Sequence, residues 1–127
     1  MKYTIDKQDK YLLIQLLENK LDATVSPQLK SEFVTLNAEG HKNIVLDLSQ
    51  VKYIDSSGLS SILVGNRLAN DSEGLFVLAG VTDHVMKLIK ISQLDSVLEI
   101  MPTVQEAVDA VFFSELESEL GDSGEEA

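Results

Sequence analysis

Apolar and polar residues alternate with two different periods along this chain, and the periods mark out its elements. Near the N-terminus, Tyr3 and Ile5 alternate with polar neighbours, and residues 11–17 form an almost continuous apolar run. A period of two is typical of a half-buried strand, and the polar residues 6–10 suit a hairpin connection. Two N-terminal strands joined as a hairpin are therefore predicted.

The next part of the chain changes to helical spacing. Ser26 and Pro27 indicate an N-cap followed by proline at the first helical position, and Gly40 is expected to end this helix. Residues 43–48 are a short apolar run rich in branched side chains, which is typical of a strand buried at the centre of a sheet. A helix is expected again after residues 55–58.

Strand and helix patterns continue to alternate toward the C-terminus. Residues 75–79 and 97–100 read as strands, and helices are expected to begin at the caps Thr82 and Thr103. Strands that alternate with helices imply right-handed crossovers. The predicted fold is α/β, with a mixed, mostly parallel sheet of four to five strands, an N-terminal hairpin strand at its side, and four helices.

Length and composition predict one domain with an acidic tail. The chain has 127 residues, of which 44% are hydrophobic, so residues 1–113 can form a single core. Residues 114–127 carry six acidic side chains and no basic one, and we expect them to be a disordered tail. Phe112, Leu116 and Leu120 recur at four-residue steps, however, so an amphipathic extension of the last helix that docks on a partner is the alternative.

Charge and cysteine content narrow the range of functions. The formal net charge is −11, which is the wrong sign for direct nucleic-acid binding or for lying on anionic lipid. Cysteine is absent, which excludes disulfides and thiol catalysis. There is no run of roughly 20 apolar residues that could insert into a membrane, and the N-terminal residues show no signal-peptide pattern. We expect a cytoplasmic protein.

The segment from Asp55 to Gly58 carries the most distinctive chemistry. Ser56 and Ser57 lie between an acidic residue and a glycine, just before a helical apolar pattern. A phosphate added there would meet free backbone N–H groups and the positive end of the helix dipole, so modification can change binding while the fold persists. The alternative is plain capping, in which a serine hydroxyl accepts from the backbone.

Two further residues belong with this segment. Asp22 precedes the first helix, and in a parallel sheet its loop should emerge at the same edge as the Asp55 loop. Both aspartates are candidate partner contacts, and Asx-turn capping is the alternative for each. Gly58 either lets a partner approach the backbone or relaxes a tight turn between strand and helix.

The order of elements, together with four motifs, resembles the STAS domain, and specifically the bacterial anti-sigma factor antagonists. The resemblance covers about residues 3–112. The motifs are Leu21-Asp22, residues 43–48 leading into Asp55-Ser56-Ser57-Gly58-Leu59, residues 75–81, and Val97-Leu98.

This resemblance implies a regulator that switches partners. The serine before the glycine, Ser57, would be phosphorylated by a protein that is both anti-sigma factor and serine kinase, with Ser56 as second choice. The unphosphorylated form would bind that kinase and free a sigma factor, and a serine phosphatase would reverse the modification. Asp22, Asp55, Ser56 and Gly58 would contact the partner.

The sequence also raises questions of residue assignment and of function. Ser60 and Ser61 stand where the family commonly has a small residue, so either could also be modified. The rival function is a constitutive adaptor, resembling the small STAS subunit of bacterial lipid-transport complexes, which docks on an ATPase or transport complex and is never phosphorylated.

Catalysis and metal binding are not expected. A Ser57 nucleophile would need a base, and the chain offers only His41 and His84 and no Gly-x-Ser-x-Gly elbow. No set of His, Asp and Glu shows metal-ligand spacing, and no phosphate-binding glycine loop is present, so neither a metal nor a cofactor is expected.

Overall fold

The computed structural model describes residues 1–126, with side chains described through Gly121. The helices are α1 (Ser26–Ala38), α2 (Ser56–Asp71), α3 (Asp83–Ile91) and α4 (Val104–Glu126). The strands are β1 (Tyr3–Lys7), β2 (Leu12–Leu16), β3 (Lys20–Leu21), β4 (Ile44–Asp47), β5 (Tyr53–Ile54), β6 (Phe76–Ala79) and β7 (Glu99–Met101).

The main sheet has five strands in the order β1-β2-β4-β6-β7. Strand β1 pairs antiparallel with β2, and the other neighbours are parallel. The predicted mixed sheet with an N-terminal hairpin strand and four helices is therefore confirmed. Strand β4 lies at the centre with all four residues buried, as its apolar run predicts.

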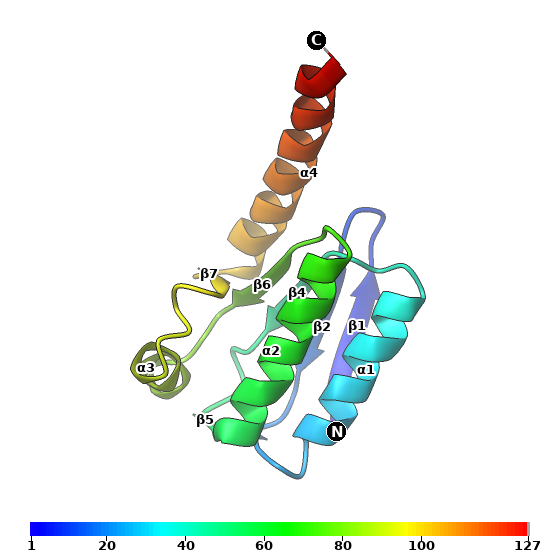
Figure 1. Cartoon of the computed structure of the whole chain (residues 1–127). Helices are drawn as coiled ribbons and strands as arrows, with labels where there is room; N and C mark the ends of the chain where they lie inside the picture. Colours follow the sequence, from blue (N-terminus) through cyan, green and yellow to red (C-terminus); the bar gives the residue numbers. More distant parts are fainter. Residues whose placement is uncertain (127) are drawn as a thin grey trace.

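Helices cover the two faces of the sheet unequally. Helices α1 and α2 lie side by side over one face, and α4 crosses the other face (Figure 1). On the first face, Phe33 of α1 meets Phe76 of β6 edge to face, with ring centroids 5.4 Å apart. On the second face, Ala107, Val108 and Val111 of α4 pack against the sheet. Because successive side chains of a strand point to opposite faces of the sheet, they pack alternately into the core under α1 and α2 and the core under α4.

Two short strands, which the apolar pattern did not predict, form a separate sheet. Strands β3 and β5 pair in parallel, with Lys20 opposite Tyr53 and Leu21 opposite Ile54. Strands of two residues are too short to show a period, so only the partner strand reveals them. This small sheet lies at the same end of the molecule as the N-terminus of α2 (Figure 1).

The last helix runs through the acidic segment. Residues 114–126 continue α4 as a helix, which is the alternative that the sequence offered to a disordered tail. Leucine and glutamate are good helix formers, and the first turn of this extension is tied to the body by Glu115, which accepts from Asn43. The composition therefore predicted the charge of this segment but not its helical backbone. The division into a domain of residues 1–113 and a separate tail stays a prediction.

Three local assignments also need correction. Val25, not Ser26, is the N-cap residue of α1, although Pro27 does lie in the first turn. Strand β7 begins at Glu99, two residues later than the predicted start of this strand. Thr82 is the N-cap of α3, but its hydroxyl donates to the Val51 carbonyl at 2.6 Å instead of accepting from the helix. At Thr82 a tertiary neighbour decides the geometry, whereas Val25 and Leu98 are held by local bonds to the carbonyls of Asp22 and Leu94.

Candidate functional site

The site is built where β3 and β5 end together. Asp22 follows Leu21 and Asp55 follows Ile54, and these two preceding residues are paired in the small parallel sheet. The Asp55 N–H also donates to the Leu21 carbonyl at 3.3 Å. The two aspartates therefore emerge at one edge, as the sequence predicted, although the pairing occurs in the small sheet and not in the main one.

Asp55 is the N-cap of α2. Its Oδ1 accepts from the Gly58 N–H at 2.9 Å and from the Ser57 hydroxyl at 2.6 Å. The expectation that a serine hydroxyl caps this helix is therefore wrong, because a carboxylate already occupies that position and Ser57 acts as a donor toward it. A carboxylate at a helix N-terminus is also favoured by the helix dipole.

Ser57 lies at the centre of a short chain of polar groups. Its hydroxyl oxygen is 3.3 Å from the Ser26 hydroxyl oxygen, and the Ser26 hydroxyl donates to the Asp22 carbonyl at 2.7 Å. Each hydroxyl has one proton, and both protons are used in the shorter bonds, so the contact between the two serines is close packing. Ser26, which is buried, is a residue that sequence reasoning missed at this site.

Asp22 forms a local turn of its own. Its Oδ1 accepts from the Thr24 N–H at 3.0 Å and from the Thr24 hydroxyl at 2.6 Å. This is the Asx-turn geometry that the sequence offered as the alternative to partner contact. Asp22 remains half-buried at the surface, so the turn leaves part of its side chain accessible.

Both aspartates are held in the charged form. Hydrogen bonds from the Ser57 hydroxyl and then from the Gly58 N–H lower the pKa of Asp55 below its usual value. Hydrogen bonds from the Thr24 hydroxyl and N–H lower the pKa of Asp22 in the same way, and the nearby Asp55 charge opposes this only weakly. The edge therefore carries two carboxylates at neutral pH.

The serines of this segment differ in accessibility. Ser56 is exposed and Ser57 is half-buried, so both can be reached from solvent. Ser61 is fully buried and its hydroxyl donates to the Gly58 carbonyl at 2.6 Å, so a kinase could reach it only after local unfolding. Ser60 is half-buried. The burial of Ser61 removes one of the sequence alternatives from the folded protein.

Gly58 has a packing role that the sequence did not suggest. A Cβ at this position would lie 2.2 Å from the Leu21 carbonyl oxygen and 2.6 Å from Cγ1 of Ile54. The glycine therefore lets the first turn of α2 press against β3 and β5. Its assignment as a partner contact stays a prediction.

An exposed aromatic pair beside the aspartates was also missed. The rings of Tyr53 and His84 stack with centroids 5.5 Å apart and an interplanar angle of 16°. Tyr53 comes from β5, and His84 from the first turn of α3. The alternation in which Ile54 points inward and Tyr53 outward was the available signal. This pair extends the polar edge with a flat aromatic surface.

The site offers polar and aromatic surface. Among the described side chains, those of residues 1–121, no group of three or more His, Cys, Asp or Glu could hold a metal ion. In the same part of the chain, no helix is both long enough and apolar enough to cross a bilayer.

Comparison with known proteins identifies the family of this domain. A family model described as "Mlab, STAS domain" matches residues 4–102. The BtrV protein of Bordetella bronchiseptica, named provisionally as an anti-sigma factor antagonist, is 31% identical over 112 residues, which are 88% of this chain and 95% of that protein.

Solved structures agree with the sequence relatives. A Thermotoga maritima protein, also named provisionally as an anti-sigma factor antagonist, superposes with a TM-score of 0.77 at 27% identity, over 86% of this chain and 93% of the other. The Bacillus cell-fate determinant SpoIIAA in its phosphorylated form has the same fold, with a TM-score of 0.70 at 22% identity, over 87% of this chain and 99% of the other. On the family model and the Bordetella relative together, this chain belongs to the STAS domain family.

Proposed function

We propose that this protein is an anti-sigma factor antagonist that acts by binding and is switched by phosphorylation of Ser57. In its unphosphorylated form it binds an anti-sigma factor that is also a serine kinase, and a sigma factor is released. Phosphorylation ends that binding until a serine phosphatase restores the hydroxyl. The names of the relatives support antagonist function, since such proteins are regulatory binding proteins and not enzymes.

The hydrogen bond from Ser57 to Asp55 is the observation that carries the switch. In the unmodified protein the hydroxyl donates to an ionised carboxylate at 2.6 Å. A phosphoserine has no hydroxyl proton to donate and brings a charge of about −1.5 to −2. Modification therefore replaces an attraction at the start of α2 with a repulsion between two anions. The close packing of Ser57 against Ser26 directs the added group outward, because Ser26 is buried.

The repulsion would act mainly on the partner. A binding surface that covers Asp55 and Asp22 removes water from these carboxylates, and an additional dianion in such a surface is unfavourable unless arginines on the partner meet it. Moving a binding equilibrium from mostly bound to mostly free takes about 3–5 kcal/mol. A desolvated charge clash of this kind supplies an energy of that order.

A second function is favoured by the same geometry. The bond from Ser57 to Asp55 and the packing on Ser26 explain this serine as a structural part of the helix start, with no need for modification. The protein would then be an adaptor subunit of an ATPase or transport complex that is never phosphorylated. Intact mass measured on protein isolated from the native bacterium, before and after stress, separates the two functions: a phosphate adduct mapped to Ser57 supports the antagonist, and its absence in all conditions supports the adaptor.

A pull-down with two variants tests the switch itself. Immobilised Ser57→Ala protein should retain a kinase-type anti-sigma partner from the native lysate, and Ser57→Asp protein should lose it. Ser56→Ala and Ser56→Asp test the second-choice serine, which is exposed. Loss of the partner by Ser56→Asp and not by Ser57→Asp would move the switch to Ser56. Equal retention by Ser57→Ala and Ser57→Asp would contradict the proposal.

A further inference from the structure

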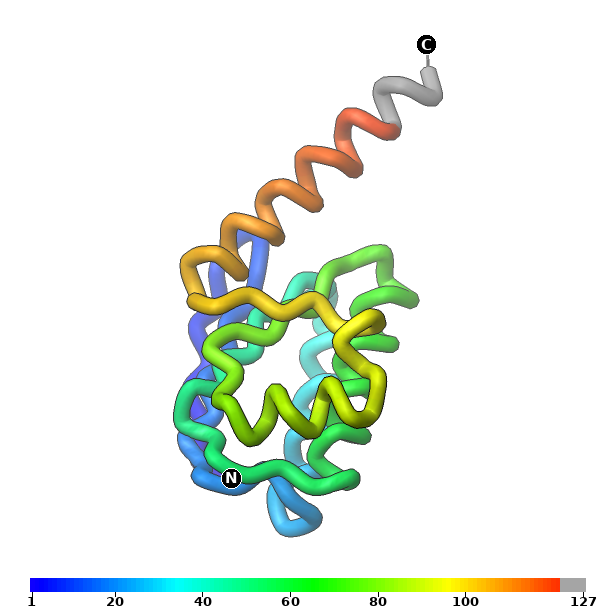
Figure 2. The backbone as a smooth tube through the Cα atoms, turned by 90° about the vertical axis from the view of Figure 1, so that its left-hand side faces the viewer, coloured from blue at the N-terminus to red at the C-terminus, as the bar shows by residue number. Residues whose placement is uncertain are grey.

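Helix α4 has two apolar faces, and only one of them is covered. Its N-terminal half buries Ala107, Val108 and Val111 against the sheet. Its C-terminal half then leaves the body and projects beyond it (Figures 1 and 2). Four large apolar side chains on this part are between 48% and 63% exposed: Phe112, Phe113, Leu116 and Leu120. We call these four residues the α4 stripe.

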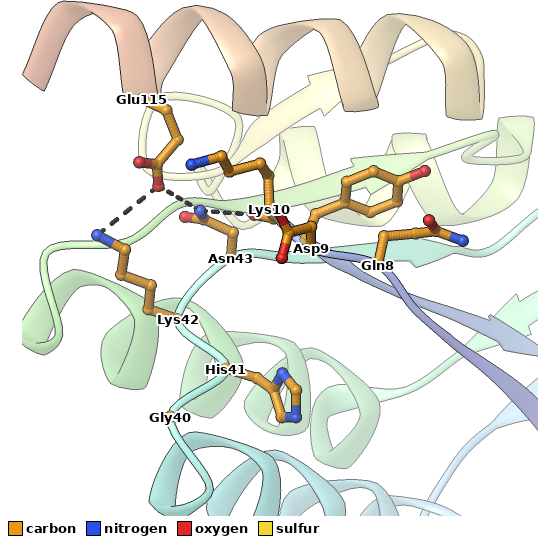
Figure 3. Close-up of a pocket in the computed structure, with 9 residues that line it drawn as sticks. Gln8, Asp9, Lys10, Gly40, His41, Lys42, Asn43 and Glu115 are labelled. Atoms are coloured by element: carbon orange, nitrogen blue, oxygen red, sulfur yellow. Dashed lines mark hydrogen bonds and ion pairs between the residues drawn. The ribbon is translucent and has the colours of Figure 1, made fainter. Parts of the chain in front are cut away.

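The side of the helix that faces the body is fixed by polar contacts. Glu115 accepts from Nδ2 of Asn43 at 2.6 Å and lies 3.7 Å from Nζ of Lys42, so its carboxylate points down onto the loop before β4 (Figure 3). At 3.6 residues per turn, Leu116 and Leu120 point away from that side. Glu115 therefore anchors the helix with the stripe turned outward.

The stripe continues into a groove on the body. Phe113 lines a groove of about 590 Å³ together with Leu75, Met101 and Ala110. On the other side, Phe112 meets Tyr11 edge to face, with centroids 6.2 Å apart. The apolar surface thus runs from the edge of the sheet along the free part of the helix. A contiguous exposed apolar surface with a polar rim is typical of an interaction site.

The charges beside the stripe restrict what can cover it. Phe113, Leu116 and Leu120 follow the spacing of a coiled-coil seam, and Glu117 and Glu119 fall on its two flanks. From Ile91 to the end of the chain there is no lysine, arginine or histidine. A second copy of this chain would bring glutamates against glutamates, and an anionic membrane surface would repel the helix equally.

We propose that the α4 stripe binds a helix of a different protein, one with an apolar seam flanked by lysine or arginine. An amphipathic helix packs its apolar side chains against such a seam, and the charges on the two flanks of the seam determine which helix binds. The free part of α4 and the N-terminus of α2, which holds Ser57, lie at opposite ends of the molecule (Figure 1). The protein can therefore hold a second partner while the Ser57 edge is occupied or modified.

Fluorescence anisotropy with synthetic peptides tests this proposal. The probe is a helical peptide of about three heptads with leucine at the seam and lysine on both flanks. One control peptide carries glutamate on the flanks, and another has the composition of the probe with the leucines scattered. The wild-type protein should bind the probe at least about tenfold more tightly than either control peptide.

Variants on the stripe separate seam recognition from general attraction to an acidic protein. Leu116→Ser with Leu120→Ser should remove the preference for the probe over the scattered peptide, and Glu117→Lys with Glu119→Lys should reverse the preference between lysine and glutamate flanks. All four side chains are exposed, and circular dichroism checks that the fold persists. Equal binding of all peptides, or unchanged binding by the serine variant, would overturn the proposal. A dimer in sedimentation that the serine variant abolishes would also overturn it, because the occupant would be a second copy.

Discussion

Replacing Gly58 with alanine should damage both the stability of the domain and the geometry of the site. The added Cβ would lie 2.2 Å from the Leu21 carbonyl oxygen and 2.6 Å from Cγ1 of Ile54. Ordinary contacts between such atoms are roughly 3.5 Å. The carbonyl belongs to the backbone and cannot rotate away, so the first turn of α2 has to move away from β3.

The size of the effect follows from two opposing contributions. Forcing a methyl group into a packed site costs about 1–3 kcal/mol, and a clash with backbone belongs at the upper end of that range. Alanine in place of glycine within a helix returns about 0.5–1 kcal/mol. We therefore expect Gly58→Ala to lower the free energy of unfolding by about 2 kcal/mol. For a domain of this size the melting temperature should fall by roughly 6–10 °C.

Urea unfolding followed by circular dichroism measures this difference, and Gly121→Ala is the matched control. A Cβ at Gly121, which is also helical, would have nothing within 4 Å. The control should match wild type or be more stable by up to about 1 kcal/mol, because alanine is the better helix former and its Cβ meets nothing. Amide chemical shifts of Asp55 and Ser57 should move in the Gly58 variant, since the bond from the Asp55 N–H to the Leu21 carbonyl has to lengthen. A Gly58→Ala protein as stable as wild type, with unchanged shifts, would refute the packing argument.

Two further predictions concern hydrogen bonds at the two ends of the molecule. Because the pKa of Asp55 is lower in the folded protein than its unfolded value of 3.8, its charged form stabilises the fold above pH 3.8, and this contribution is lost as pH falls through the folded pKa. Ser57→Ala removes the largest cause of the low pKa, so NMR titration of this variant should find the pKa of Asp55 raised. An unchanged pKa would contradict the assignment. Asn43→Ala leaves the Leu75 N–H without its acceptor and should lower the free energy of unfolding by about 1–3 kcal/mol in urea titrations. The control Asn70→Ala, at an exposed position, should change this free energy little. Equal effects of the two substitutions would show that the buried amide has no special role.

The architecture could be predicted because its signals are local. The apolar residues 44–46 of β4 indicate a strand buried at the centre of the sheet, and the structure buries all four residues of β4. The alternation of Tyr3 and Ile5 likewise predicts a strand with one covered face, and β1 is the antiparallel edge of the sheet. Periods of this kind depend on the side chains of one segment and the solvent, so no partner segment has to be known.

The site was only partly predictable, because its bonds join distant segments. Ser26 has the right residue type and position for a cap, but the Asp22 carbonyl takes its proton and Ser57 lies against it from 31 positions away. The reason for glycine at position 58 lies in the Leu21 carbonyl, which sequence spacing cannot reveal. The neighbourhood of Asp22 and Asp55 was predictable, since parallel strands end at a common edge. Which serine is modified stays a prediction.

The small sheet of β3 and β5 is so short that it fixes the length of the connection from β2 into β3. Only two residue pairs set its register, and each position along it alternates between core and solvent. A slip of one residue in this pairing would turn the buried Leu21 outward. In the turn between β1 and β2, Gln8 and Asp9 are exposed, and the Lys10 carbonyl after them accepts from Nδ2 of Asn43 at 2.9 Å. Tags and reporter loops therefore belong in that hairpin turn, because added length there leaves the edge with Asp22 and Asp55 in place.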